Sequence, residues 1–178
     1  TNLYNVLIQN STVNGSSNYV GSLIGYAPYG GTLNNAFTTN TTVNGTGYVG
    51  GMIGYNALSA SNLQYSGRIN ATSGNVGGIF GYSNSTILDT AQFNGNLTGG
   101  SYSGGILGQL YANTAVVIGN LTSQGSMNLT SASGNIGGVI GYLYINGYPS
   151  SFSVNFNNVN SSIQIGATTG NYTGGLIG

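Results

Sequence analysis

The stretch YVGGMIGY at Tyr48–Tyr55 decides how this chain folds, because variants of it recur along all 178 residues. The other copies are YVGSLIGY at Tyr19–Tyr26, NVGGIFGY at Asn75–Tyr82, YSGGILGQ at Tyr102–Gln109, NIGGVIGY at Asn135–Tyr142 and YTGGLIG at Tyr172–Gly178. Their final glycines are the repeat-core glycines Gly25, Gly54, Gly81, Gly108, Gly141 and Gly178. The intervals are 29, 27, 27, 33 and 37 residues, which indicates a base period near 27 with insertions in the last two repeats.

A period of this length is typical of one coil of a β-solenoid, in which a coil buries its apolar face only by stacking on its neighbours. The sequence therefore predicts an all-β fold, a β-solenoid (β-helix) of about six coils, with residues 1–178 forming one continuous array. Gly54, Gly81 and Gly108 are expected one above another at the strand spacing of about 4.8 Å. Of each apolar pair, such as Met52 and Ile53, one residue is expected to enter the core.

The segments between the motifs read as strands and turns. Short apolar alternations predict brief strands at Leu33–Phe37, Leu63–Tyr65 and Ala115–Leu121. Asn-Gly pairs are expected to supply the positive φ angles of sharp corners at Asn14, Asn44, Asn94 and Asn146. No segment shows helical periodicity, and glycine interrupts nearly every candidate helix, so we expect no helix.

The composition excludes most kinds of chemistry. One Lys or Arg (Arg68), one Asp or Glu (Asp89), no His and no Cys leave no acid–base pair and no activated nucleophile, so the chain is not expected to be an enzyme. The same counts predict no metal site, no cofactor and no nucleic-acid partner. No apolar run reaches the roughly 18 to 20 residues of a membrane helix, so no membrane span is expected in this segment.

The six motif copies resemble the GLUG repeat, a glycine-rich unit found in tandem in large surface and secreted proteins, including bacterial adhesins. The resemblance rests on the recurring core of two glycines, two hydrophobic residues and a glycine, as in GGMIG at Gly50–Gly54. It implies a secreted or surface-displayed solenoid without catalytic activity of its own. The near-absence of charge between the motifs departs from the family, whose members often carry charged residues there.

Eleven Asn-X-Ser/Thr sequons are candidate N-glycosylation sites: Asn10, Asn14, Asn40, Asn44, Asn70, Asn84, Asn96, Asn120, Asn128, Asn160 and Asn171. Five of them keep phase with the repeat, namely Asn14, Asn44, Asn70, Asn96 and Asn128. They predict either a column of glycans, which would place the chain outside the cell, or a bare ladder of hydrogen-bonded amides. Because glycans are wider than the coil spacing, occupancy should be incomplete and should favour Asn84, Asn120 and Asn160.

Tyrosine keeps the same phase and predicts two aromatic columns. One precedes the motif, at Tyr19, Tyr48, Tyr102 and Tyr172, and the other follows it, at Tyr26, Tyr55, Tyr82 and Tyr142. Exposed rings in rows could stack on sugars and make an adhesive face. Alternatively, the rings could stack on one another and stabilise successive coils.

These patterns predict an extracellular structural module of a cell-surface filament or stalk that stacks end to end and carries N-linked glycans. The array is expected to be a segment of a longer chain or fibre, with other copies of itself and covalently attached or bound glycans as partners. A carbohydrate-binding adhesin using the stacked Tyr is the alternative. An ice-binding solenoid ranks third, because its Thr would have to be regularly spaced, whereas here they are scattered, as at Thr38 and Thr41.

Overall fold

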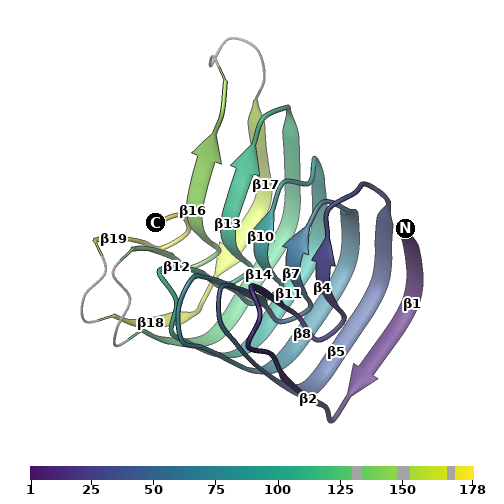
Figure 1. Cartoon of the computed structure of the whole chain (residues 1–178). Helices are drawn as coiled ribbons and strands as arrows, with labels where there is room; N and C mark the ends of the chain where they lie inside the picture. Colours follow the sequence, from purple (N-terminus) through teal and green to yellow (C-terminus); the bar gives the residue numbers. More distant parts are fainter. Residues whose placement is uncertain (130–133, 148–152, 168–170) are drawn as a thin grey trace.

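The computed structural model describes residues 1–129, 134–147, 153–167 and 171–178, and all regular structure in these ranges is β-strand. The strands form three parallel sheets that run along one stack of coils (Figure 1). Each of the four inner coils contributes one long strand and two short ones, and the register repeats about every 30 residues over six levels, with five turns from the first to the last. The predicted all-β solenoid is confirmed. Among the described residues there is no helix that could cross a membrane.

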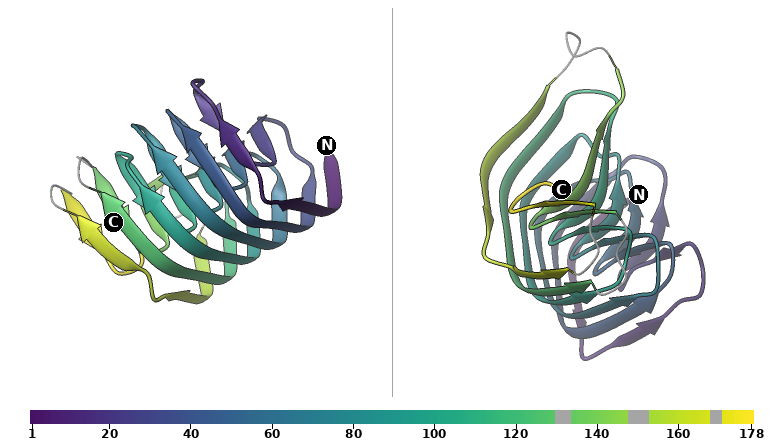
Figure 2. Two further views of the ribbon diagram at one scale, coloured as in Figure 1. Left: turned by 90° about the horizontal axis from the view of Figure 1, so that it is seen from below. Right: turned by 90° about the vertical axis from the view of Figure 1, so that its left-hand side faces the viewer.

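The long sheet forms the broad curved wall of the stack (Figure 2). In spatial order its strands are β1 (Asn2–Gln9), β5 (Thr32–Gly45), β8 (Ser59–Ala71), β11 (Ile87–Thr98), β14 (Val116–Leu129) and β17 (Val154–Ser161). In the two end coils a second strand continues the path, β2 (Thr12–Asn14) beside β5 and β18 (Gln164–Ala167) beside β14. The brief strands expected at Leu33–Phe37 and Leu63–Tyr65 are thus parts of strands 14 and 13 residues long.

The two short sheets carry the glycine motif. The entry sheet contains β3 (Tyr19–Val20), β6 (Tyr48–Gly50), β9 (Asn75–Gly77), β12 (Tyr102–Gly104), β15 (Asn135–Gly137) and β19 (Tyr172–Gly174). The return sheet contains β4 (Ile24–Ala27), β7 (Ile53–Asn56), β10 (Phe80–Ser83), β13 (Leu107–Ala112) and β16 (Ile140–Ile145). An isolated bridge between Ile140 and Ile177 adds the sixth level.

The repeat-core glycines stack as predicted. Phe80 and Tyr82 pair with Ile53 and Tyr55, which places Gly81 level with Gly54 in the neighbouring strand. A Cβ atom on Gly108 would lie 2.5 Å from the carbonyl oxygen of Gly81. It would also lie 2.6 Å from the backbone nitrogen of Val76, in the entry sheet. The glycine column therefore lets the return sheet pack on the entry sheet backbone to backbone.

The core lies between the long sheet and the motif, and it takes more of each motif than expected. In the four inner motif copies both residues of the apolar pair are fully buried, as Met52 and Ile53 show, so the expectation of one core residue per pair is wrong. Met52 lies in the tight turn between β6 and β7, and its N–H and that of Ile53 both donate to the carbonyl of Ile79 in the next coil. The side chain of the turn residue Met52 thus points inward and fills the core beside that of Ile53, the first residue of β7.

Left-handed residues bend the long strands, but they are not the predicted ones. Among non-glycine residues, positive φ angles occur at one column of the long sheet, namely Asn5, Asn35, Asn62, Thr90, Asn120 and Asn158, and also at Asn10 and Asn40. Of the Asn-Gly pairs expected at corners, those that begin at Asn14, Asn44 and Asn94 contain no residue with positive φ, and only Asn146 precedes a glycine with positive φ. Asparagine tolerates the left-handed region better than other non-glycine residues, and here a repeated Asn takes the role expected of glycine.

Candidate functional site: sequon groove and tyrosine strip

Asparagine side chains form hydrogen-bonded ladders along the stack. In the left-handed column, Asn35 Nδ2 donates to Asn5 Oδ1 at 2.5 Å and Asn62 Nδ2 to Asn35 Oδ1 at 2.8 Å. Thr90 interrupts the column, and Asn120 Nδ2 donates instead to Asp89 Oδ1 at 2.9 Å. Asn158 Nδ2 then donates to Asn120 Oδ1 at 2.9 Å. Each amide that donates to one coil and accepts from the next ties three successive coils together.

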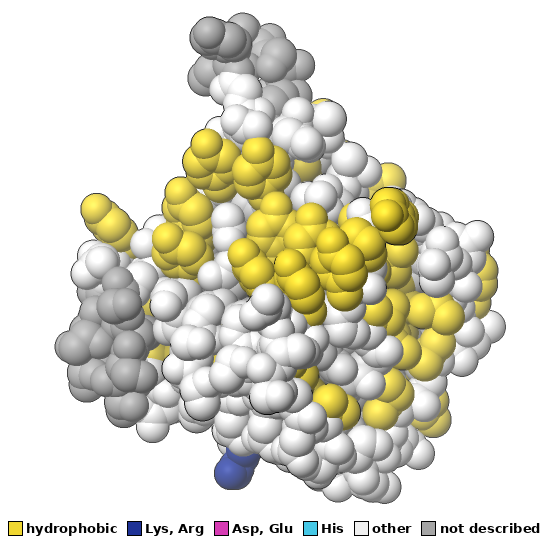
Figure 3. All heavy atoms as spheres, in the orientation of Figure 1, with side chains coloured by type: hydrophobic (Ala, Val, Ile, Leu, Met, Phe, Trp, Pro, Cys, Tyr) yellow, Lys and Arg dark blue, Asp and Glu magenta, His cyan; other side chains and the backbone are white. Residues whose placement is uncertain are grey.

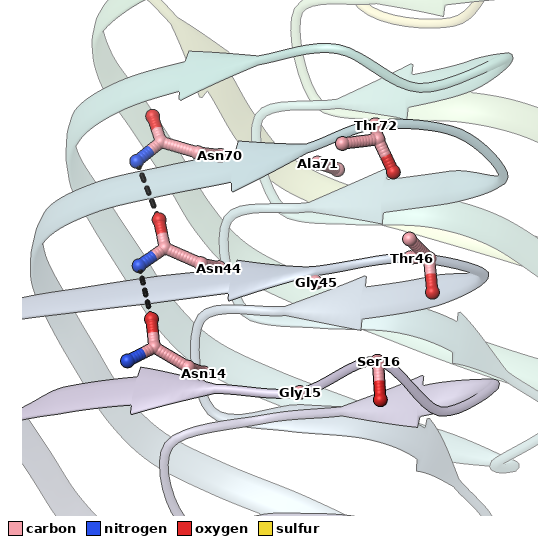
Figure 4. Close-up of a pocket in the computed structure, with 9 residues that line it drawn as sticks. All are labelled: Asn14, Gly15, Ser16, Asn44, Gly45, Thr46, Asn70, Ala71 and Thr72. Atoms are coloured by element: carbon pink, nitrogen blue, oxygen red, sulfur yellow. Dashed lines mark hydrogen bonds between the residues drawn. The ribbon is translucent and has the colours of Figure 1, made fainter.

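A second ladder coincides with the sequons. Asn44 Nδ2 donates to Asn14 Oδ1 at 2.6 Å, and Asn70 Nδ2 donates to Asn44 Oδ1 at 2.7 Å (Figure 4). Thr98 takes the next position, and its Oγ1 donates to Asn70 Oδ1 at 3.2 Å. Asn128 lies beyond Thr98 in the same column.

Asn96 lies outside this column, against expectation. It lies two residues before Thr98, where it pairs with Arg68 and Ser126 in the long sheet. Its side chain is exposed, and its Oδ1 accepts from Ser126 Oγ at 2.9 Å. The number of residues between Asn96 and the following motif is similar to that of the column members. Only the pairing register shows that Asn96 belongs to a different column.

Three complete sequons line one open groove of about 580 Å³, which we call the sequon groove. Its residues are Asn14, Gly15, Ser16, Asn44, Gly45, Thr46, Asn70, Ala71 and Thr72. Figure 4 shows the amides along one side and the hydroxyl side chains of Ser16, Thr46 and Thr72 along the other. Both groups that define an N-glycosylation sequon therefore recur at successive coils on one surface.

The remaining sequons differ in access. Exposed Asn side chains are those of Asn10, Asn14, Asn40, Asn96, Asn120, Asn128, Asn160 and Asn171, and half-buried ones are those of Asn44, Asn70 and Asn84. Asn84 is turned inward, since its Nδ2 donates to the Tyr55 hydroxyl at 3.3 Å and its Oδ1 is buried without a hydrogen-bond partner. Asn40 Nδ2 donates to Asn10 Oδ1 at 2.7 Å, which forms a shorter ladder.

The predicted tyrosine columns lie side by side on the two short sheets, and we call them together the tyrosine strip. Its members are Tyr19, Tyr26, Tyr48, Tyr55, Tyr82, Tyr102 and Tyr142. In the space-filling view, a band of hydrophobic side chains runs across the return sheet where the strip lies (Figure 3). Stacked pairs include Tyr19 with Tyr26 at 4.6 Å and Tyr55 with Tyr82 at 4.7 Å between ring centroids.

Polar residues interrupt the strip at Asn135, in the entry column between Tyr102 and Tyr172, and at one matched pair. Asn75 replaces Tyr in the entry column and Gln109 replaces Tyr in the return column. These two side chains meet each other, with Asn75 Nδ2 donating to Gln109 Oε1 at 2.6 Å. The pair occupies the same relative positions as Tyr48 and Tyr82 one coil earlier. An amide pair thus replaces a ring pair and keeps a side-chain contact between the two columns.

Burial, with help from the neighbouring Tyr55, raises the pKa of Tyr82. Burial and the nearby Tyr26 also raise the pKa of Tyr55. These hydroxyls therefore stay protonated as hydrogen-bond donors well above neutral pH. Because neighbouring rings cover one another's faces, the contacts support a stabilising role for the strip more directly than a sugar-stacking one.

Comparison of the chain with protein-family models, with curated proteins and with solved structures gave no match. The resemblance to GLUG repeats therefore rests on the six motif copies and stays a prediction.

Proposed function

We propose that this chain is an extracellular structural module of a cell-surface filament or stalk, stacked end to end and carrying N-linked glycans on part of its sequons. The observation that carries the proposal is the continuity of the backbone pairing and of the apolar core from coil to coil, with amide ladders that join successive coils along parts of the stack. Such a structure resists extension along its axis through many parallel hydrogen bonds. The near-absence of charged side chains gives catalysis no groups to use.

The ladders refine which sequons should carry sugar. A glycan bonds to Nδ2, and at Asn44 and Asn70 that atom is already engaged with the neighbouring coil. Adjacent glycans in the sequon groove would also start only about 4.8 Å apart. We expect the highest occupancy at the exposed Asn96 and Asn128, a lower one at Asn160, whose Nδ2 donates to Asn158 Oδ1 at 3.2 Å, and the lowest at Asn84.

Two measurements on native material test the proposal. Electron microscopy should show rods or filaments of constant width, and glycopeptide mass spectrometry should find sugar mainly at Asn96 and Asn128. Isolated globules would refute the filament role. An intact mass equal to that of the bare polypeptide would refute glycosylation and with it the main support for an extracellular address.

Carbohydrate binding is the second candidate function, favoured by the half-exposed position of the tyrosine strip. Tyr26 is the most exposed of the strip's stacked rings and has the best access to a sugar. Tyr26→Ala should abolish binding to a neutral polysaccharide on a glycan array if the strip is adhesive. Tyr29→Ala is the matched control, because Tyr29 is 83% exposed and belongs to neither column. Equal loss with both variants, or no binding by the unaltered chain, would remove this candidate.

A further inference from the structure

Tyrosine is the side chain of this chain that a one-electron oxidant reaches, because the other oxidisable side chains are absent or buried. The sequence has no Cys, Trp or His, and its two Met residues, Met52 and Met127, are at most 1% exposed. Thiols and thioethers, the usual targets of oxidation in proteins, are therefore not available. Rings of the tyrosine strip such as Tyr55 and Tyr82 are only half-buried. Oxidation from solvent thus generates phenoxyl radicals on this strip.

Tyr55 and Tyr82 have the geometry that the coupling of two such radicals requires. They are paired residues of the adjacent parallel strands β7 and β10, so their rings extend from the return sheet in the same direction. The ring centroids lie 4.7 Å apart, and the ring planes differ by 17°. The ring carbons next to the hydroxyl of one tyrosine therefore lie near the corresponding carbons of the other.

The orientation of the neighbouring rings selects this pair. The unpaired electron of a phenoxyl radical occupies orbitals perpendicular to the ring, so a new bond forms along the stacking direction, toward a ring that presents its face. Tyr19 meets Tyr55 at 85° and Tyr48 meets Tyr82 at 77°, which are edge contacts. Tyr26 is tilted by 56° against Tyr55. Within the described part of the chain, Tyr55 and Tyr82 are each the only ring stacked on the other.

The polar step next to Tyr82 limits the alternatives further. The following position of the return column is Gln109, whose Oε1 accepts from Asn75 Nδ2. An amide does not form a phenoxyl radical, so a radical on Tyr82 has no coupling partner at that position. Tyr111 and Tyr144 form a second stacked pair of paired residues, between β13 and β16, with ring centroids 5.2 Å apart and planes that differ by 20°.

We propose that the tyrosine strip is a site of oxidative cross-linking, at which a haem peroxidase and hydrogen peroxide join Tyr55 to Tyr82 in a dityrosine bond. Each ring loses one electron together with its hydroxyl proton. One C–C bond then forms between ring carbons next to the two oxygens, and the hydrogen on each of these carbons moves to the ring oxygen and restores the phenol. The protein loses two hydrogen atoms in total, and the peroxide is reduced to two molecules of water.

The bond connects adjacent coils through residues that are 27 positions apart, in a chain that has no cysteine for disulfides. A covalent link between distant residues stabilises a fold mainly by restricting the unfolded chain, as a disulfide does. A bond between Tyr111 and Tyr144 does the same for two later coils. Cross-linking within one chain goes beyond the proposed function, because it requires neither filaments nor glycans.

Oxidation of the recombinant, sugar-free full chain at low protein concentration, with a haem peroxidase and hydrogen peroxide, tests this proposal. The product should run as a monomer, show dityrosine fluorescence and have a mass lower by two hydrogen atoms for each bond. After digestion with pepsin, mass spectrometry should find the peptide that contains Tyr55 joined to the peptide that contains Tyr82. The urea midpoint of the linked chain should be higher than that of the untreated chain.

Two phenylalanine variants separate the stacked pair from tyrosine in general. Tyr82→Phe keeps a ring at the same position but removes the hydroxyl that is oxidised, so the joined peptide should fall to background. Tyr65→Phe is the matched control, because Tyr65 is 1% exposed and its stacked neighbour is Phe93, which forms no phenoxyl radical. The dityrosine yield of Tyr65→Phe should equal that of the unaltered chain.

Oxidation of the urea-unfolded chain shows what the folded geometry contributes, and it should give mixed pairs that include Tyr65. The same mixture from the folded chain, or a bond from Tyr55 to Tyr26 in place of Tyr82, would overturn the assignment of the pair. Products linked only between chains, or a mass that increases by oxygen without dityrosine fluorescence, would overturn cross-linking within the chain. Filament images and glycopeptide masses are separate measurements, so these outcomes leave the proposed function as it stands.

Discussion

The glycine motif and the long sheet repeat with the same coil, yet they restrict their residues very differently. The third motif glycine is kept in all six copies, whereas one inward column of the long sheet reads Thr38, Tyr65, Phe93 and Ser123 over four coils. At the motif glycine the neighbours are backbone atoms, which cannot retreat. In the long sheet the neighbours are side chains, which can exchange volume from coil to coil. Positions where backbone packs against backbone thus keep the same residue in every coil. Positions where side chain packs against side chain vary from coil to coil.

The second motif glycine lies between these extremes. Gly78 faces the ring of Phe93, and Gly105 faces Ser123, whose Oγ donates to the carbonyl of Gly138. In the first copy this position is Ser22, and it meets the smaller Thr38, with 3.5 Å between the two hydroxyl oxygens. The residues that face this position thus vary from Phe93 to Ser123 while the motif residue is Gly or Ser.

The largest expected effect comes from adding one methyl group to the glycine column. Gly108→Ala would place a Cβ 2.5–2.6 Å from the Gly81 oxygen and the Val76 nitrogen, so the two short sheets must separate. We expect a loss of about 4 kcal/mol or more in the free energy of unfolding, measured by urea titration, or no folding at all. Gly30→Ala is the control, because a Cβ there meets nothing within 4 Å and should change stability by no more than about 0.5 kcal/mol. Similar stability of the two variants would break the comparison.

A core substitution in the long sheet should cost slightly less. Phe93 is fully buried, and Phe93→Ala should lower the free energy of unfolding by about 3 to 5 kcal/mol through the lost transfer energy and the cavity. The double variant Phe93→Ala with Gly78→Ala sharpens the test. If volume alone decided, the added methyl would refill part of the cavity. Because a Cβ on Gly78 would also collide with the Gly105 carbonyl, we expect the double variant to be less stable than Phe93→Ala in the same titration.

The sequence alone predicted the fold class and the stacked motif because the motif glycines must be identical. The sequence did not predict the details at positions where different residues serve the same structural role. Both Met52 and Ile53 are buried, since the turn itself points inward, and a simple in–out alternation cannot predict that. The phase of Asn96 was misjudged because the repeat length varies, and intervals to the motif do not give the strand register.

The left-handed ladder was missed, although the sequence contains a signal for it. Asn5, Asn35, Asn62 and Asn120 recur near the repeat period, each next to an apolar residue within a strand-like segment. Asn-Gly pairs drew the prediction instead because they are the usual signal for tight turns between antiparallel strands. In a parallel coil, left-handed Asn residues at the bend stack from coil to coil and hydrogen-bond through their amides. The informative pattern is therefore the recurrence of Asn at the repeat period, and not the residue that follows it in the sequence.

Substitutions in the amide ladder should have a smaller effect on the free energy of unfolding. They test whether a polar column tolerates substitution as poorly as the glycine column or as well as the long-sheet core. Asn44 donates to Asn14 and accepts from Asn70, so Asn44→Ala removes two hydrogen bonds. We expect a loss of about 1 to 2 kcal/mol in the free energy of unfolding of the sugar-free chain. Asn14→Ala, which removes only the bond at the first rung, should cost about half as much. Equal costs for the two variants would mean that the rungs do not act one by one.

The smallest effect concerns pH, and it separates the tyrosines from the rest of the molecule. Burial raises the pKa of Tyr65, whose hydroxyl donates to the carbonyl of Thr41 at 2.8 Å, and burial raises the pKa of Tyr82 as well. A tyrosine whose folded pKa exceeds its unfolded value of about 10 stabilises the fold fully below pH 10. Above that pH the unfolded chain loses its proton first, so stability falls as pH rises.

With no His and no Cys in the chain, we expect the urea midpoint to be nearly constant from about pH 6 to 9 and to decrease above about pH 10. Tyr65→Phe should lower stability at pH 7 by about 1 kcal/mol, through the lost hydrogen bonds to Thr41 and Arg68. It should also reduce the slope above pH 10, because one group that resists ionisation is gone. Tyr29→Phe is the control, since Tyr29 lies on the surface and should change neither quantity. An unchanged slope in Tyr65→Phe would show that the decrease at high pH comes from the tyrosine strip, and comparing it with Tyr82→Phe would then locate the responsible ring. The two variants would thus show whether the Tyr65 hydroxyl in the long-sheet core or the Tyr82 hydroxyl on the motif surface causes the loss of stability at high pH.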